Sequence, residues 1–191
     1  MLNIVLFGPP GAGKGTQSAK LIEKFNLVHI ATGDLFRKHL SEGTELGKLA
    51  QSYMSEGNLV PDKVVIDMVD DKIKDHADAA GIIFDGFPRT VAQAEALDAL
   101  MASKETPILG MLALQVPEKE LIGRLLERGK TSGRADDQNL EKIKNRLNVY
   151  QNETVPVAEY YQTQEKFQPI EGVGEIDDIF NSLCEAIEEL S

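Results

Sequence analysis

The glycine-rich segment at residues 8–14, Gly-Pro-Pro-Gly-Ala-Gly-Lys, constrains the fold of this chain of 191 residues more than any other feature. It matches the pattern G-x-x-x-x-G-K and follows an unbroken apolar run at residues 2–7. Apolar residues with helical spacing come next, at residues 14–25. Because such an apolar run is typical of a strand buried on both faces, the segment predicts a phosphate-binding loop between a parallel strand and a helix.

Two polar side chains in and after this loop are candidate ligands of a bound phosphate and its metal ion. Lys14 can reach the β and γ phosphates of a nucleoside triphosphate, while the glycines let backbone N–H groups curl around them. Serine or threonine usually follows the lysine; here Gly15 follows it and Thr16 comes next, so we assign Mg2+ coordination to Thr16. The alternative is a tight glycine turn without a ligand, but loose glycine motifs lack the lysine and the flanking elements.

Further apolar runs alternate with helical patterns along the rest of the chain. The runs lie at residues 82–84, 108–114 and 167–170. The helical patterns lie at residues 35–54 with an interruption at Gly43, 62–74 with Asp62 as the expected N-cap, 116–127, 139–165 with a break at Pro156, and 176–190. This alternation predicts an α/β fold with a parallel sheet flanked by helices, and the length fits one domain.

The distribution of charge narrows the class of ligand. With 20 Lys and Arg against 31 Asp and Glu, the formal net charge is −11, which repels polyanions and makes nucleic acid an unfavourable partner. Small anions can still bind if basic groups gather in one cleft. The arginines all lie beside glycine-rich, proline-containing or charge-dense segments, at Arg37, Arg89, Arg124, Arg128, Arg134 and Arg146.

Several classes of protein are disfavoured by what the sequence lacks. The single cysteine, Cys184, cannot form an intrachain disulfide, and with three scattered histidines it offers no four-ligand zinc site. No apolar run approaches the roughly 20 residues that span a bilayer, and the first residues lack the pattern of a secretory signal. We therefore expect a cytoplasmic protein without a structural metal or a membrane partner.

Four motifs resemble those of the adenylate kinases, and the resemblance extends over nearly the whole chain. Residues 14–17, Lys-Gly-Thr-Gln, resemble the nucleoside monophosphate kinases in general. Residues 32–37, Thr-Gly-Asp-Leu-Phe-Arg, resemble a segment whose threonine and arginine contact AMP, and residues 57–61 resemble the strip that lines its adenine. Residues 85–89, Asp-Gly-Phe-Pro-Arg, followed by Gln93, resemble the signature that holds the magnesium shell, the AMP phosphate and the adenine.

The resemblance implies a P-loop NTPase fold of three layers with a parallel five-stranded sheet. It implies one kinase domain, residues 1–191, that contains a helical NMP-binding segment at residues 31–60 and a short lid at residues 124–138. The segment at residues 132–137, Ser-Gly-Arg-Ala-Asp-Asp, resembles the short-lid members, which lack the cysteine-bearing zinc lobe of long-lid members.

The resemblance also assigns the site residues. The residues implied for ATP are Gly11, Ala12, Gly13, Lys14, Gly15, Thr16, Arg128 and Gly174. The residues implied for AMP are Thr32, Gly33, Arg37, Leu59, Val60, Gly86, Arg89, Gln93, Arg134 and Arg146. The residues implied in catalysis are Lys14, Arg89, Arg124, Arg128, Arg134 and Arg146. Magnesium would be held by Thr16 and, through water, by Asp85, which follows the apolar run at residues 82–84 where a second strand beside such a loop supplies the metal carboxylate.

The activity implied is the reversible transfer of the γ-phosphoryl group of Mg-ATP to AMP, which gives two ADP. Such a transfer needs little acid–base chemistry because the acceptor oxygen is already anionic, and arginine forks suit phosphate oxygens. We therefore expect no catalytic histidine, and the resemblance implies a monomer.

Two alternatives stay open at this point. A UMP/CMP-type kinase has a similar short lid, but that group tends to carry Ala-Gly-Glu at residues 32–34 and asparagine in place of Gln93. A regulatory module that binds nucleotide without transfer is the second alternative, although simple retention of a nucleotide needs fewer arginines. For Gly174, a plain turn between strand and helix is as good an interpretation as a contact with adenine.

Overall fold

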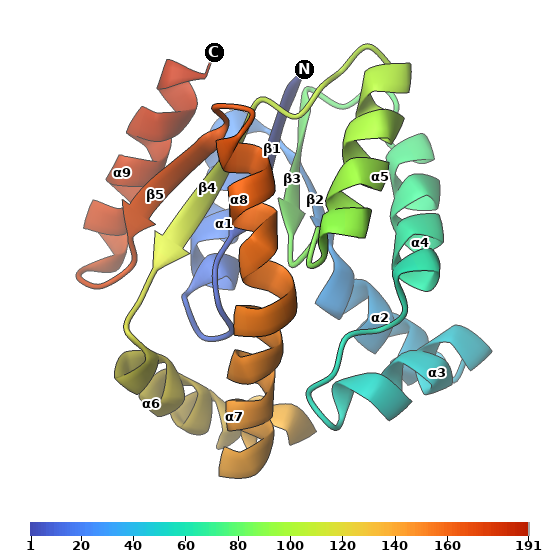
Figure 1. Ribbon diagram of the computed structural model, residues 1–191, viewed down its shortest axis with the longest axis vertical. Coiled ribbons are helices and arrows are strands. Elements are labelled where there is room, and N and C mark those ends of the chain that lie inside the picture. Colours follow the sequence, from blue (N-terminus) through green and yellow to red (C-terminus); the bar gives the residue numbers. More distant parts are fainter. Residues whose placement is uncertain (191) are drawn as a thin grey trace.

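Five parallel strands form the centre of the molecule in the order β2-β3-β1-β4-β5, as the computed structural model of residues 1–190 shows (Figure 1). This confirms the predicted α/β fold with a five-stranded parallel sheet. The strands are β1 (Leu2–Phe7), β2 (Val28–Ala31), β3 (Gly81–Asp85), β4 (Gly110–Gln115) and β5 (Phe167–Glu171).

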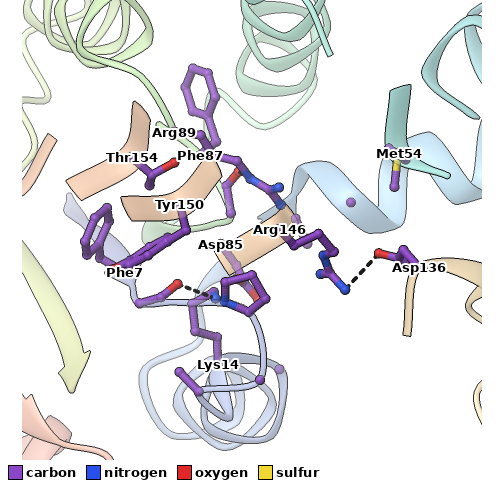
Figure 2. A pocket seen from close by; sticks show the side chains of 18 of the residues that line it. Phe7, Lys14, Met54, Asp85, Phe87, Arg89, Asp136, Arg146, Tyr150 and Thr154 are labelled. Carbon is purple, nitrogen blue, oxygen red and sulfur yellow. Dashed lines mark hydrogen bonds and ion pairs between the residues drawn. The ribbon is translucent and has the colours of Figure 1, made fainter. Parts of the chain in front are cut away.

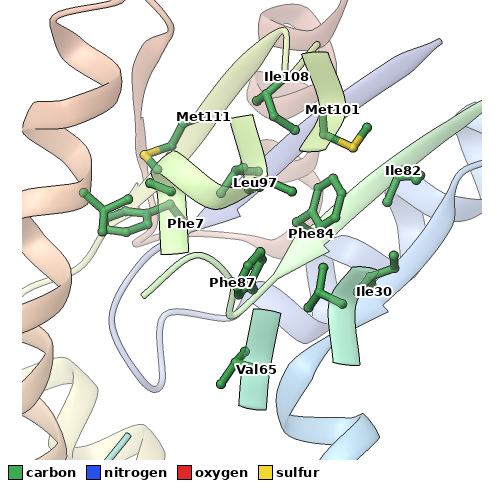
Figure 3. Close-up of a cluster of buried hydrophobic side chains, with 14 of the residues drawn as sticks. Phe7, Ile30, Val65, Ile82, Phe84, Phe87, Leu97, Met101, Ile108 and Met111 are labelled. Carbon is green, nitrogen blue, oxygen red and sulfur yellow. The ribbon is translucent and has the colours of Figure 1, made fainter. Parts of the chain in front are cut away.

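Helices cover both faces of the sheet, so that its central strands are buried on each side. Along β1, Ile4 and Leu6 join one apolar cluster, while Val5 and Phe7 join the other. Helices α1 (Lys14–Phe25) and α9 (Ile176–Glu189) cover the first face. Helices α4 (Asp62–Lys74), α5 (Val91–Ser103) and α8 (Val155–Gln162) cover the second, whose aromatic and aliphatic side chains interlock between sheet and helices (Figure 3).

Two groups of helices project beyond the carboxyl ends of the strands, on opposite sides of the phosphate loop (Figure 1). One contains α2 (Thr32–Ser41) and α3 (Glu45–Met54), which pack against each other in a hairpin interrupted at Gly43, as predicted. The other contains α6 (Glu118–Gly129), a 3₁₀ turn (Ala135–Asp137) and α7 (Leu140–Val149). The first group lies within residues 31–60, and residues 124–138 lie within the second.

Three local expectations need correction. The sequence pattern did not locate β2, because a strand of four residues that runs directly into α2 is too short for its period to be distinguished. Asp62 does not cap α4: Pro61 holds that position, and the carboxylate accepts hydrogen bonds from Thr90 and Gln93 instead. Pro156 does not break the chain into separate helices, because a π-helical turn, Tyr150–Thr154, joins α7 to α8. The proline lies in the first turn of α8, where its lack of an N–H donor is tolerated.

The register of the central strands places the site. Leu6 of β1 pairs with Asp85 of β3, so the phosphate loop and this carboxylate leave the sheet side by side at its carboxyl edge. The connections from β1 and β3 run to opposite sides of the sheet, and ligands of open α/β sheets bind in the crevice at such a point. Among the helices of residues 1–190, none is long and apolar enough to cross a membrane.

Candidate active site

A cleft of about 510 Å³ lies at this edge of the sheet, between the two projecting groups of helices. All six arginines of the chain line it, together with Lys14. Asp34, Asp85 and Asp136 are the carboxylates that line it, so positive charge predominates in a protein of net charge −11. Lys14, Asp85, Arg89 and Arg146 are drawn in Figure 2 around one common space. The arginines that lie on separate motifs of the sequence therefore gather in one cleft of the fold.

The phosphate loop wraps around the ammonium group of Lys14. Its Nζ donates to the carbonyl oxygens of Gly8, at 2.8 Å, and Pro9, at 3.2 Å. Gly11 and Gly13 take φ angles of 86° and 92°, which glycine adopts without strain, and α1 begins directly after them. Thr16 lines the same cleft in the first turn of α1. The loop thus has the backbone conformation and the helix start that favour a bound phosphate.

Burial lowers the pKa of Lys14 to about 8, because it disfavours the charged form and the nearby Asp85 only partly compensates. We expect kcat/KM for Mg-ATP to fall as the pH rises through about 8, since this ratio reports the free enzyme and a neutral lysine attracts phosphate poorly. The kcat profile should stay flat to higher pH, because bound phosphates favour the ammonium form. Initial rates from pH 6.5 to 10 test this.

The matched control for this profile is Lys14→Arg. Its guanidinium stays charged across the range, so the variant should lose the basic limb even where its activity is lower. A wild-type kcat/KM that stays level to pH 10 would contradict the expectation.

Asp85 lies at the end of β3 against His29 of β2. His29 Nε2 is 3.5 Å from Asp85 Oδ2, which is within ion-pair range but too long for a good hydrogen bond. Burial raises the pKa of Asp85, but His29 and the positive charge of Lys14 outweigh it and hold the pKa below its ordinary value. Asp85 is therefore a carboxylate at neutral pH. Because Thr16 and Asp85 offer oxygen ligands to one cleft, this donor set fits Mg2+.

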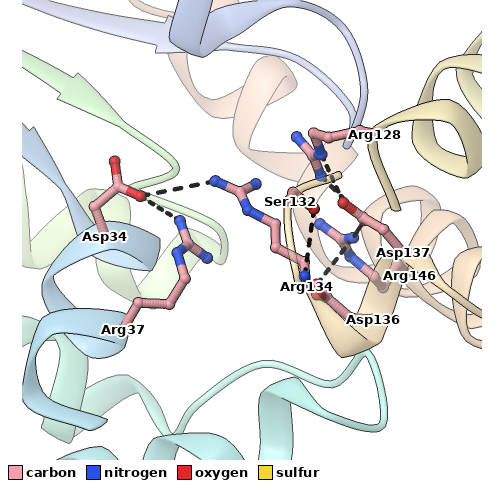
Figure 4. A network of polar contacts seen from close by, with 8 residues as sticks. All are labelled: Asp34, Arg37, Arg128, Ser132, Arg134, Asp136, Asp137 and Arg146. Atoms are coloured by element: carbon pink, nitrogen blue, oxygen red, sulfur yellow. Dashed lines mark hydrogen bonds and ion pairs between the residues drawn. The ribbon is translucent and has the colours of Figure 1, made fainter. Parts of the chain in front are cut away.

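Asp137 organises the arginines on the lid side (Figure 4). Its side chain is 0% exposed and accepts from Arg128 at 2.6 and 3.0 Å and from Arg146 Nη1 at 2.5 Å. Arg146 also pairs with Asp136 at 2.9 Å. Burial raises the pKa of Asp137, but the two arginines lower it by more. The pKa therefore lies below its ordinary value. One buried carboxylate thus fixes two arginines that face the cleft.

Asp34 of α2 is one of the residues through which the two projecting groups meet across the cleft. It pairs with Arg37 one helical turn away and approaches Arg134 of the lid segment at 3.8 Å. Burial and the neighbouring Arg37 lower the pKa of Arg134. Exposed contacts of this kind contribute little stability. The groups also meet where Asn145 of α7 donates to the carbonyl oxygen of Glu56 at 2.7 Å and to Asn58 Oδ1 at 3.1 Å.

Arg89 stands at the centre of the cleft floor. Its Nε donates to the carbonyl oxygen of Gly86 at 2.7 Å, and Gly86 turns the chain with φ 70°. Burial lowers the pKa of Arg89 to about 10, and repulsion by Arg146 lowers it further than burial alone would. The group is still a cation at neutral pH, held where cations repel one another. A negatively charged ligand would relieve that repulsion.

A small cavity of about 30 Å³ opens beside Arg89, between α2 and the start of α4. We call it the small cavity. Its walls are mainly apolar or glycine, with Gln93 among the polar exceptions. The residues that line it are Thr32, Gly33, Phe36, Met54, Asn58, Leu59, Val60, Val65, Gly86, Arg89 and Gln93. It holds about one or two water molecules, so a larger ligand needs more room than this volume gives.

The structure brings nearly all the predicted site residues together. Each lines the cleft or the small cavity except Gly174, which lies in the turn before α9. That turn is tied to the cleft indirectly, since Arg124 Nη2 donates to Gly172 O at 3.3 Å and Gln17 donates to Ile176 O at 3.0 Å. Arg124 and Arg128 both line the cleft from α6, as their spacing of four residues predicts.

Sequence reasoning missed two residues of the site. Asp137 lay within a recognised motif, but its role as the partner of two arginines depends on α6, the 3₁₀ turn and α7 meeting in space. The pair Asp136 and Asp137 after Arg134 was the available signal. His29 was covered only by the expectation of no catalytic histidine. Its place beside Asp85 follows from the pairing of β3 with β2, a strand that the pattern did not locate.

Positive charge is spread over the whole cleft, from Lys14 at the loop to Arg37 and Arg89 beside the small cavity. The phosphates of a single nucleoside triphosphate would contact only part of this charged surface. A phosphate loop, a carboxylate on the adjacent strand and arginines placed for two anionic ligands define a P-loop kinase of nucleotides.

The family model described as adenylate kinase matches residues 6–166, so the chain belongs to the adenylate kinase family. Curated proteins named adenylate kinase are similar over the full length. Those of Bacteroides thetaiotaomicron and Flavobacterium psychrophilum are each 50% identical over 190 residues, with 100% of both chains covered. That of Parabacteroides distasonis is 51% identical over 187 residues, with 98% of both chains covered.

Proposed function

We propose that the protein transfers the γ-phosphoryl group of Mg-ATP reversibly to AMP and so forms two ADP. The observation that carries the proposal is the convergence of all six arginines and Lys14 on one cleft above the phosphate loop. Full-length similarity to proteins named adenylate kinase supports the same reaction. The high content of arginine in the cleft disfavours a module that only retains nucleotide.

We assign the donor side of the cleft to ATP. The phosphate loop, with Lys14, would hold the β and γ phosphates, and Arg124 and Arg128 would reach them from α6. Thr16 and, through water, Asp85 would hold Mg2+, which neutralises charge on the β and γ phosphate oxygens. Gly174 would support the adenine through its backbone, an assignment that rests on the family resemblance, since this residue lies outside the cleft.

We assign the acceptor side to AMP. The small cavity would take the adenine, with Gln93 and the backbone around Leu59 and Val60 at its walls. Arg37 and Arg89 would bind the AMP phosphate, while Arg134 and Arg146 would bridge it and the group in transit. The acceptor oxygen attacks as an anion, so the arginines act by holding two anions in line and by stabilising the charge of the transition state.

Two parts are proposed to move during turnover, residues 31–60 and residues 124–138. The weak contact between Asp34 and Arg134 supports this, since it is easily broken and reformed. The small volume of the small cavity supports it too, because adenine needs more room. Closure over both nucleotides would exclude water and limit hydrolysis of ATP. We further propose a cytoplasmic monomer; the buried free thiol of Cys184 is consistent with a reducing setting.

Phosphorus NMR tests the proposal. The purified protein is mixed with Mg-ATP and, in separate samples, with AMP, CMP, UMP or GMP, each beside a magnesium-free control. Rapid and selective formation of ADP with AMP is the expected result. A preference for CMP or UMP would indicate a pyrimidine kinase, and bound ATP without transfer would indicate a regulatory module. Fast hydrolysis of ATP in the absence of AMP would contradict the proposed closure.

A further inference from the structure

The side-chain amide of Gln93 is held in one orientation at the wall of the small cavity. Gln93 is 1% exposed; its Oε1 accepts from the backbone N–H of Arg89 at 2.7 Å, and its Nε2 donates to Asp62 Oδ1 at 2.8 Å. A backbone N–H can only donate and a carboxylate can only accept. Exchanging the two ends of the amide would break both hydrogen bonds, so the partners define which end is oxygen and which is nitrogen.

Asp62 is itself fixed by contacts that do not involve a ligand. It is the first residue of α4, and its Oδ1 also accepts from the hydroxyl of Thr90 at 3.0 Å. The Thr90 hydroxyl in turn accepts from the backbone N–H of Gln93 at 3.2 Å and so caps α5. The carboxylate therefore ties the starts of α4 and α5 together through contacts made within the protein.

The fixed amide gives the small cavity one polarity for the edge of a base. After both hydrogen bonds, Nε2 retains one N–H and Oε1 retains one lone pair. A 6-aminopurine offers an acceptor at N1 and a donor at the 6-amino group, which complement this pair. A 6-oxopurine offers a donor at N1 and an acceptor at O6, so in the same position donor would face donor and acceptor would face acceptor.

We infer that Asp62 is a positioning residue that sets the preference of the acceptor site for a 6-aminopurine over a 6-oxopurine by fixing the amide of Gln93. The inference rests on the proposed function, in which the small cavity takes the base of AMP. Without the carboxylate, the backbone N–H of Arg89 alone opposes rotation of the amide, and the polarity of the cavity weakens.

The test compares AMP with IMP, which differs from AMP only in the 6-substituent and the proton at N1. The ratio of kcat/KM for AMP to kcat/KM for IMP is measured with Mg-ATP as donor, because a general loss of activity cancels in this ratio. In Asp62→Ala we expect the ratio to fall about tenfold or more, the effect of losing a hydrogen bond to a charged group. Asp62→Asn, whose amide oxygen can still accept from Nε2, should keep the ratio within about threefold of the unmodified protein.

Three further variants make the result decisive. Asp62→Ser keeps a small polar side chain at the first residue of α4 but is too short to hold Nε2, so it should behave as Asp62→Ala and serves if that variant does not fold. Asp67→Ala removes an exposed carboxylate of the same helix, which pairs with Lys63 at 2.8 Å, and should leave the ratio unchanged. Gln93→Ala removes the amide itself and should bring the ratio close to one.

The outcomes separate the inference from the proposed function. If Gln93→Ala abolishes the preference while Asp62→Ala and Asp62→Ser retain it, the role of Asp62 is overturned and the proposed function stands. If Gln93→Ala also retains the preference, the amide does not read the base and the inference fails. If the unmodified protein does not phosphorylate AMP, the proposed function fails first and takes the inference with it.

Discussion

Replacing Arg89 with alanine is expected to slow phosphoryl transfer to AMP by about 100-fold or more, the usual effect of removing one preorganised group that stabilises the transition state. Its guanidinium stands between Arg37, Arg146 and Asp85 on the floor of the cleft. It is a cation in a place where other cations oppose it, so its position is not explained by stability. The fold should survive, because removing this charge relieves repulsion that already lowers its pKa.

Steady-state rates with saturating Mg-ATP and AMP, together with thermal unfolding of the same samples, test this expectation. Lys104→Ala is the matched control, since it removes an exposed cation at the end of α5, away from the cleft, and should leave both quantities unchanged. Turnover of Arg89→Ala within a few-fold of the unmodified protein would show that the acceptor side has been assigned wrongly.

Gly81→Ala is expected to destabilise the fold by about 3 kcal/mol, more than most single substitutions, because backbone atoms have to move. A Cβ at this position would lie 2.1 Å from the carbonyl oxygen of Leu2 and 2.8 Å from its carbon, in the pair that opens the contact of β1 with β3. Thermal unfolding should show a midpoint lowered by roughly 10 °C for a chain of this size. Activity should fall as well, because these strands carry the phosphate loop and Asp85.

Gly123→Ala is the control for this comparison, because it makes the same change where there is room. Apart from its chain neighbours and the backbone of its own helix, no atom of the described residues lies within 4 Å of its added Cβ, and the position is inside α6. Alanine favours a helix over glycine, so this variant should be stabilised by roughly 0.5–1 kcal/mol. Equal changes in the unfolding midpoint for Gly81→Ala and Gly123→Ala would mean that β1 and β3 can move apart to accept a Cβ at position 81 without loss of stability.

The sequence predicts those parts of the fold whose signal is local. The phosphate loop, the buried strand before it and the helix after it follow from neighbouring residues, and so does the alternation of strands and helices. Residues whose roles depend on distant partners were harder to predict. Asp62 looked like a helix cap from its neighbours alone, yet its partners Thr90 and Gln93 lie about thirty positions away, and no local pattern indicates them.

The candidate site divides in the same way. The arginines could be selected because they cluster on recognisable motifs, and the structure places all six in the cleft. The ion pairs that hold two of them could not be predicted, since Asp137 contacts Arg128 and Arg146 only when α6 and α7 are folded against the 3₁₀ turn. Gly174 lies at the limit of what a motif can assign, because a turn between β5 and α9 has the same composition with or without a ligand.

The arginine-lined cleft in a protein of net charge −11 also affects how nucleotides arrive. At physiological ionic strength charges are screened beyond about 8 Å, so an approaching anion responds mainly to the nearest surface. Over most of that surface it is repelled, and only at the mouth of the cleft is it drawn in. Added salt weakens both the repulsion by the surface and the attraction at the cleft. The first change speeds the capture of nucleotide and the second slows it. The rate of nucleotide capture should therefore depend less on ionic strength than it would in a protein that is positive throughout.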